Sequence, residues 1–215
     1  MSGGVRVADA GGVVLEIAAS IEENSAWLSE IDGAIGDGDH GINMSKGFSQ
    51  AASTLGNDGG SLAAAFHTLG DTLLSGIGGS MGPLYGTFFL DMANALQGRD
   101  TLDAAGCSRM MHAGMAGVMD LGNAKPGDKT LLDTLAPAIE AFDAAAHNGA
   151  NFATALRAMS AAAELGRDST RDMVAKIGRA ARLGERSRGV LDAGASSCCL
   201  ILQTLAAGLQ RRISE

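Results

Sequence analysis

The apolar positions along the chain recur at helical spacing, and no stretch alternates apolar and polar residues in the manner of a half-buried strand. Val13, Val14 and Ile17, for example, fall on one side of a helix. Alanine, leucine and methionine dominate the apolar set, which favours helices over strands. The pattern predicts an all-α protein. Helices are expected over residues 9–23, 25–31, 40–55, 62–75, 83–96, 102–121, 128–147, 151–165, 168–183 and 195–211.

Polar residues and prolines indicate where several of these helices begin. Ser61 and Thr101 can each cap the helix that follows, and Asn151 opens another. Pro83 fits the first turn of its helix. Pro137 lies inside an expected helix, which it should kink or restart.

Length and charge narrow the class of protein. The 215 residues permit a single domain over residues 1–215, with residues 1–8 as a loose N-terminal end. The net charge of −8 argues against nucleic acid and anionic membranes as partners. The sequence contains no run of 18 apolar residues, so no membrane span is expected. The first twenty residues lack the basic-then-apolar order of a signal peptide. The three cysteines are expected to be free thiols, which is typical of a protein in the reducing cytoplasm. The chain has no C-x-x-C pair, so a structural zinc site is not expected.

Glycine is unusually frequent for a helical chain, with 31 residues. The glycines gather in four loops, at residues 33–41, 76–82, 122–127 and 184–194. Helices need few glycines, so these loops imply special backbone conformations or a close approach of the backbone to a ligand.

The first loop contains three aspartates within eight residues, Asp32, Asp37 and Asp39. Carboxylates this close repel one another, and a hard cation such as Mg²⁺ or Ca²⁺ between them relieves the repulsion. The order of an EF-hand is missing, so two Mg²⁺ ions shared across a polyphosphate fit better. His40 and Asn43 begin the next helix, whose amino end can receive an anion. The alternative is an acidic turn with aspartates as helix caps.

The second and third loops each precede a helix. Glycines and Ser80 in the second suit a phosphate cradle, although close helix packing explains them as well. The third nearly matches a Walker A loop, but Asp128 separates Gly127 from Lys129 and no strand precedes it. Lys129 and Thr130 can still favour phosphate, and a plain helix–helix turn is the alternative.

The fourth loop, taken with its flanks over residues 178–197, concentrates four arginines in an acidic protein. Arginine binds phosphate in a bidentate manner, although a solvated basic face is the alternative. Acidic metal ligands, glycine turns before helices and a basic loop together are the components of Mg²⁺–nucleotide binding. The remaining histidines, His67, His112 and His147, lie in expected helices and suit packing or surface roles.

At this point the four loops resemble those of a known family, the nucleotide-binding subunit of dihydroxyacetone kinase or the equivalent C-terminal domain of its single-chain forms. The resemblance runs from about residue 10 to the end. It rests on DGAIGDGDHGINMSKGF at residues 32–48, GGSMGPLYGTFF at 78–89, KPGDKT at 125–130, GR at 178–179 and LGERS at 183–187.

The resemblance implies a closed barrel or bundle of about eight antiparallel helices, with the nucleotide site in loops at one rim. It implies ADP or ATP bound through two Mg²⁺ ions held by Asp32, Asp37 and Asp39. The residues that it assigns to the nucleotide are His40, Gly41, Ile42, Asn43, Ser80, Met81, Gly122, Leu131, Arg179, Asp192, Ala193 and Gly194.

One segment departs from the family pattern. The family usually reads Gly-His-x-Asp-Pro-Gly-Ala in the fourth loop, where this chain has Val190 and Ala193 in place of the histidine and the proline. The replacements remove a polar group and a fixed backbone φ. They put nucleotide affinity, or docking of a partner, in question.

The implied activity is phosphoryl transfer from Mg²⁺-bound nucleotide to a three- or four-carbon ketose. In this family the ketose is held on a sugar-binding subunit or domain, so the chain is expected to act with such a partner. The donor is either exchangeable ATP, or bound ADP that a phosphotransferase-system protein rephosphorylates. The alternative is a nucleotide-loaded interaction module without catalysis of its own.

Overall fold

A computed structural model describes residues 3–214, and nine α-helices make up most of this part of the chain. Their bounds are α1 Gly12–Glu23, α2 Ser25–Ile35, α3 His40–Leu55, α4 Leu62–Gly76, α5 Met81–Ala95, α6 Ala104–Gly122, α7 Leu132–His147, α8 Phe152–Ser169 and α9 Ala193–Gln210. The prediction of an all-α protein is confirmed.

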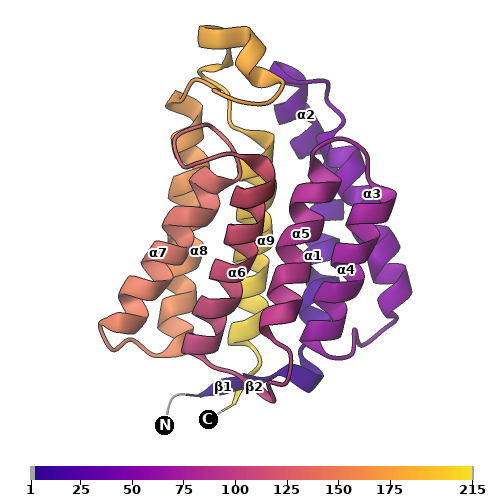
Figure 1. Cartoon of the computed structure of the whole chain (residues 1–215), viewed down its shortest axis with the longest axis vertical. Helices are drawn as coiled ribbons and strands as arrows, with labels where there is room; N and C mark the ends of the chain where they lie inside the picture. Colours follow the sequence, from indigo (N-terminus) through magenta and orange to yellow (C-terminus); the bar gives the residue numbers. More distant parts are fainter. Residues whose placement is uncertain (1–2, 215) are drawn as a thin grey trace.

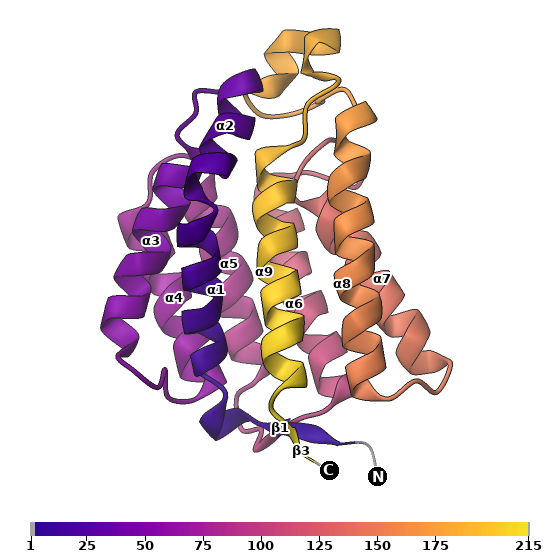
Figure 2. The same cartoon turned by 180° about the vertical axis from the view of Figure 1, so that it is seen from behind.

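Eight of the described helices form a closed ring in which neighbours run antiparallel (Figures 1 and 2). The order around the ring is α1, α3, α4, α5, α6, α7, α8 and α9, and α9 packs against α1 to close it. The short α2 lies at one end, against α3 and α9. This is the antiparallel barrel that the resemblance implied. The alternation places the amino ends of α3, α5, α7 and α9 at one rim.

The capping residues explain most helix starts. The Ser61 hydroxyl accepts the Ala64 N–H at 3.2 Å, and Asn151 Oδ1 accepts the Thr154 N–H at 2.9 Å, as predicted. Thr101 is not a cap: Asp103 begins α6 instead, accepting the Gly106 N–H at 2.7 Å. Pro137 neither ends nor restarts α7, which runs continuously through it.

The chain also contains a small sheet that the sequence did not predict. It has three antiparallel strands in the order β2-β1-β3, namely β1 Gly4–Arg6, β2 Thr101–Leu102 and β3 Ile213–Ser214. The prediction of a loose end over residues 1–8 is therefore wrong from Gly4 onward, while residues 1–2 lie outside the described residues. Val5 is 1% exposed, so burial of an apolar side chain and two backbone ladders hold the segment.

The predicted helix over residues 168–183 is also wrong. Instead α8 continues to Ser169, and two 3-10 segments follow, η2 (Thr170–Asp172) and η3 (Ala180–Ser187). The backbone between them is extended at Met173 and left-handed at Gly178, with φ 72°. Contacts from distant residues, described below, hold this segment in a non-helical path.

The core lies inside the ring. Phe66 and Phe88 pack on Phe89 with ring centroids 5.6 and 5.1 Å apart, and the thiols of all three cysteines are free and buried. In the described residues one helix, α9, is long and apolar enough to span a membrane, with mean hydropathy 1.2. It is 67% buried within the protein, as a core helix is.

Candidate functional site

A cleft of about 570 Å³ opens at the rim where α3, α5, α7 and α9 begin. All four glycine-rich loops contribute to it, or to the helix ends beside it. Most residues predicted for metal or nucleotide line this cleft: Asp32, Asp37, Asp39, His40, Asn43, Ser80, Met81, Gly122, Leu131, Arg179, Asp192, Ala193 and Gly194. Segments as far apart in sequence as Asp32 and Gly194 thus form one site.

Two of the predicted nucleotide residues do not line the cleft. Gly41 is buried where the first turn of α3 crosses α2, and a Cβ at this position would overlap the Ser25 carbonyl oxygen. This glycine therefore permits the two helices to approach closely. Ile42 is 66% exposed and points away from the core.

The three aspartates form a compact carboxylate cluster at the end of α2 and the start of α3. Asp32, Asp37 and Asp39 each place a carboxylate oxygen within 4.8 Å of the others. Gly38, with φ 77°, lets the chain turn back between the last two. An all-oxygen set of this kind suits Mg²⁺. The guanidinium of Arg179 forms an ion pair with Asp37, so the fourth loop contacts the cluster directly.

A chain of buried and partly buried hydrogen bonds connects the aspartate cluster to α5 and α9. The His40 N–H donates to Asp32 Oδ2 at 3.3 Å, and His40 Nε2 lies 3.0 Å from the Ser197 hydroxyl. Tyr85 Oη in turn lies 2.8 Å from that hydroxyl and donates to the Gly194 carbonyl oxygen at 3.1 Å. Burial lowers the pKa of His40 to about 4, and Asp32 opposes this only in part. The imidazole is therefore neutral at pH 7 and connects α3 to α9.

The amino ends of helices give the cleft a preference for anions. Residues at or just before the first turns of α3, α5, α7 and α9 line it, and free N–H groups concentrate at such ends. Asp192 caps the amino end of α9, and its Oδ2 accepts the Ala195 N–H at 2.7 Å. Burial raises the pKa of this carboxyl to about 6, against the stabilising effects of that N–H and of Lys129. Carboxylates and helix ends in one cleft match a cation–polyanion complex.

Lys129 lies differently from the phosphate-binding lysine of a Walker A loop. It is 2% exposed, and its Nζ donates to the carbonyl oxygens of Met173 (3.2 Å), Ser187 (2.5 Å) and Val190 (2.7 Å). All three acceptors belong to the segment between α8 and α9. Lys129 therefore holds the arginine-bearing segment in place from within.

Sequence reasoning missed the residues that act behind the cleft wall. Lys129 was considered only as a phosphate ligand, while Tyr85 and Ser197 received no role. A usable signal exists for Ser196 and Ser197, because two adjacent hydroxyl residues stand among small and apolar residues in the first turns of α9. Both are buried and hydrogen-bonded at the cleft end of α9.

Known proteins share this architecture and these loops. The model of the DAK2 domain matches residues 34–207. The chain is 40% identical over 183 residues to the ADP-binding subunit DhaL of the PEP-dependent dihydroxyacetone kinase of Escherichia coli (strain K12), covering 85% of this chain and 87% of that protein. It is 37% identical over 195 residues to the corresponding subunit of dihydroxyacetone kinase 1 of Listeria innocua, covering 90% and 91%.

A solved structure is similar as well. The dihydroxyacetone kinase of C. freundii, in complex with AMP-PNP and Mg²⁺, superposes with a TM-score of 0.70 at 27% identity, over 92% of this chain. The chain spans 33% of that longer protein. The match over most of the sequence, together with the helical ring and its rim of glycine loops, shows that the chain belongs to the DAK2-domain family, alongside the ADP-binding subunits of dihydroxyacetone kinases.

Proposed function

We propose that this chain is the nucleotide-binding subunit of a dihydroxyacetone-type kinase. It would bind ADP or ATP in the rim cleft and take part in phosphoryl transfer to a small ketose held by a sugar-binding partner subunit. One observation carries the proposal: the three-aspartate cluster and the amino ends of four helices share one cleft. Its cavity, about 570 Å³, is of the size typical for small-molecule sites.

The carboxylate cluster fits Mg²⁺ by its donor set. Asp32, Asp37 and Asp39 would hold two ions, which when bound neutralise the charge of the nucleotide phosphates. Arg179 now pairs with Asp37 and lies close enough to exchange this carboxylate for a phosphate oxygen. The backbone N–H groups at the helix starts would orient the phosphates, and apolar lining such as Leu84 and Leu131 would exclude water.

The chain's partners follow from the same proposal. Both relatives named above are ADP-binding subunits of PEP-dependent dihydroxyacetone kinases, so the preferred donor route passes from a phosphotransferase-system protein to the bound ADP. The ketose would be dihydroxyacetone, with a four-carbon ketose as the alternative substrate. The proposed location is the cytoplasm, and neither nucleic acid nor membrane is among the proposed partners.

A reconstitution assay tests this function. The chain is mixed with dihydroxyacetone or erythrulose, with Mg²⁺, and with either ATP or phosphoenolpyruvate plus the phosphotransferase proteins. Ketose phosphate is expected only when a sugar-binding kinase subunit is added. The E. coli ADP-binding subunit serves as the positive control for the other components. Nucleotide binding without turnover under all of these conditions would favour the interaction module instead.

The replacement of the family's proline by Ala193 leads to a further prediction. Ala193 is the first residue of α9, where proline is favoured, and Asp192 before it has φ −79° and ψ 132°, a conformation that tolerates a following proline. Ala193→Pro is therefore expected to stabilise the protein by about 0.5 kcal/mol through a less flexible unfolded chain. Urea unfolding measures the change.

The contrasting variant is Ala195→Pro, two residues further along α9. The Ala195 N–H donates to Asp192 Oδ2, so proline there removes the cap bond and should destabilise by about 1 kcal/mol. If the two prolines changed the free energy of unfolding equally, residue 193 would not be a first-turn position that tolerates the loss of its N–H group.

A further inference from the structure

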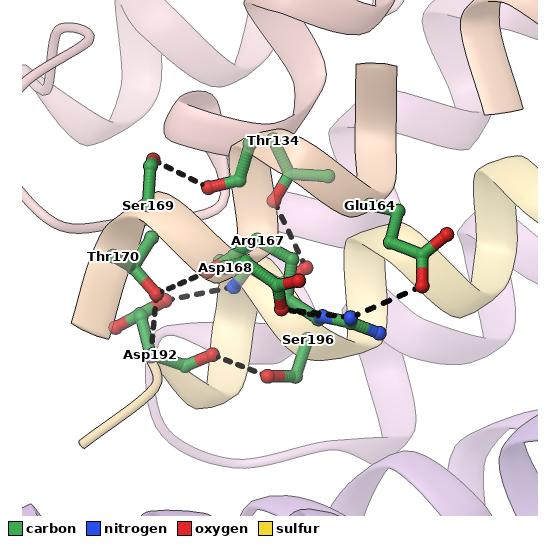
Figure 3. Close-up of polar contacts among 10 residues, drawn as sticks. Thr134, Glu164, Arg167, Asp168, Ser169, Thr170, Asp192 and Ser196 are labelled. Carbon is green, nitrogen blue, oxygen red and sulfur yellow. Dashed lines mark hydrogen bonds and ion pairs between the residues drawn. The ribbon is translucent and has the colours of Figure 1, made fainter. Parts of the chain in front are cut away.

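Thr170 lies behind the wall of the cleft, where α8 ends and η2 begins (Figure 3). Its side chain is fully buried. The hydroxyl donates to the Arg167 carbonyl oxygen at 2.6 Å and accepts the Asp192 N–H at 3.0 Å. One hydroxyl therefore joins the last turn of α8 to the residue that begins α9.

The residue that Thr170 contacts shapes the cleft. Asp192, Ala193 and Gly194 form part of its lining. The side chain and carbonyl group of Asp192 already bind the first turn of α9, through Ala195 N–H at 2.7 Å and Ser196 Oγ at 2.8 Å (Figure 3). Those bonds lie within α9, whereas the Thr170 bond connects this turn to a different helix.

The last turn of α8, on the other side of Thr170, has further polar contacts. The Arg167 guanidinium pairs with Asp168 at 2.7 Å and with Glu164 at 3.5 Å, which braces the last turn of α8 (Figure 3). The Gly189 N–H donates to the Arg171 carbonyl oxygen at 2.7 Å, so η2 also holds the chain just before Asp192. The Thr170 hydroxyl thus links the last turn of α8 to the Asp192 end of the cleft wall.

We propose that Thr170 is a positioning residue for the nucleotide site, setting where the Asp192–Gly194 wall lies through its bond to the Asp192 N–H. This inference rests on the proposed function. Ala193, the first residue of α9, does not fix its own backbone φ as a proline would, and the Thr170 hydroxyl supplies a constraint on this backbone from outside α9. Removing the hydroxyl leaves the Asp192 N–H without its acceptor and loosens the wall at Asp192, while Tyr85 still holds the Gly194 carbonyl oxygen from α5.

The variants are Thr170→Val, which keeps the shape and removes the hydroxyl, and Thr170→Ser, which restores it. Ser169→Ala is the matched control, because that neighbouring hydroxyl donates only to the Gly166 carbonyl within its own turn. Two quantities are measured: the Kd for Mg·ADP, and the hydrogen-exchange rate of the Asp192 amide in nucleotide-free protein. The exchange rate does not depend on nucleotide binding.

Thr170→Val is expected to raise the Kd about tenfold and to speed exchange at Asp192 about tenfold. Thr170→Ser and Ser169→Ala should each stay within about twofold of wild type. Unchanged exchange or unchanged Kd in Thr170→Val overturns the inference, as does an equal effect of Ser169→Ala. Failure of the wild-type chain to bind Mg·ADP would instead refute the proposed function, while the exchange result would still report on the Thr170 bond.

Discussion

Replacing Asp37 with asparagine is expected to weaken Mg²⁺-dependent binding of ADP about a hundredfold or more. Even changes to groups around metal ligands cost roughly 10- to 100-fold in metal affinity, and Asp37 would be a ligand itself. Asparagine keeps the size of the side chain and one oxygen but removes the negative charge that Asp37 would contribute, beside Asp32 and Asp39, to binding a cation. Calorimetric titration with Mg·ADP, repeated in excess EDTA, measures the loss.

Asp58→Asn is the control for the change in net charge. Asp58 lies between α3 and α4, at the end of the ring away from the cleft, and its carboxylate accepts only the nearby Gly60 N–H. Its replacement should leave the affinity within about twofold of wild type. Unchanged Mg·ADP affinity in Asp37→Asn, with a normal circular dichroism spectrum, would falsify the metal assignment.

Replacing Lys129 with methionine is expected to lower the free energy of unfolding by about 3 kcal/mol. The change keeps a long, unbranched side chain but leaves the carbonyl oxygens of Met173, Ser187 and Val190 without the donor they share. Hydrogen bonds to charged groups contribute about 1.5–3 kcal/mol each, but the desolvation cost of burying the ammonium, which methionine does not incur, offsets part of the loss. Both side chains share the left-handed backbone, φ 63°, so its strain cancels in the comparison. Urea unfolding monitored by circular dichroism measures the difference.

Lys125→Met is the control, because Lys125 is exposed in the same loop. It should change stability by less than about 0.5 kcal/mol. If Lys129→Met were equally mild but weakened nucleotide binding strongly, Lys129 would bind phosphate after all, and its contacts with the three carbonyls would not be structural anchors.

Local sequence patterns predicted most of the helices and much of the candidate site. Periodic apolar residues located nearly all helices, and Ser61 and Asn151 act as caps because a short polar side chain can reach N–H groups three residues on. The three aspartates could be recognised as a candidate metal site because like charges within eight residues repel one another unless a cation binds between them. These features depend on residues that are close together in the sequence, so the sequence alone is enough to predict them.

The missed features depend on residues far apart in sequence. Thr170 meets Asp192 across 22 positions and Lys129 meets Val190 across 61, so nothing near residue 175 reveals that a helix cannot continue there. The β1 strand likewise finds its partners near residues 101 and 213. Gly41 looked like a ligand contact because it lies in the motif, but its lack of a side chain serves helix packing.

The small sheet has a consequence for engineering. Val5 pairs with Ile213 in an antiparallel ladder, so the two ends of the described chain lie side by side, at the end of the ring opposite the cleft (Figure 1). A fused domain, an affinity handle or a surface tether at either end would therefore leave the cleft open to solution. The same closeness suits a circular permutant, in which a short linker joins the two ends and the exposed turn around Gly149 supplies new ones.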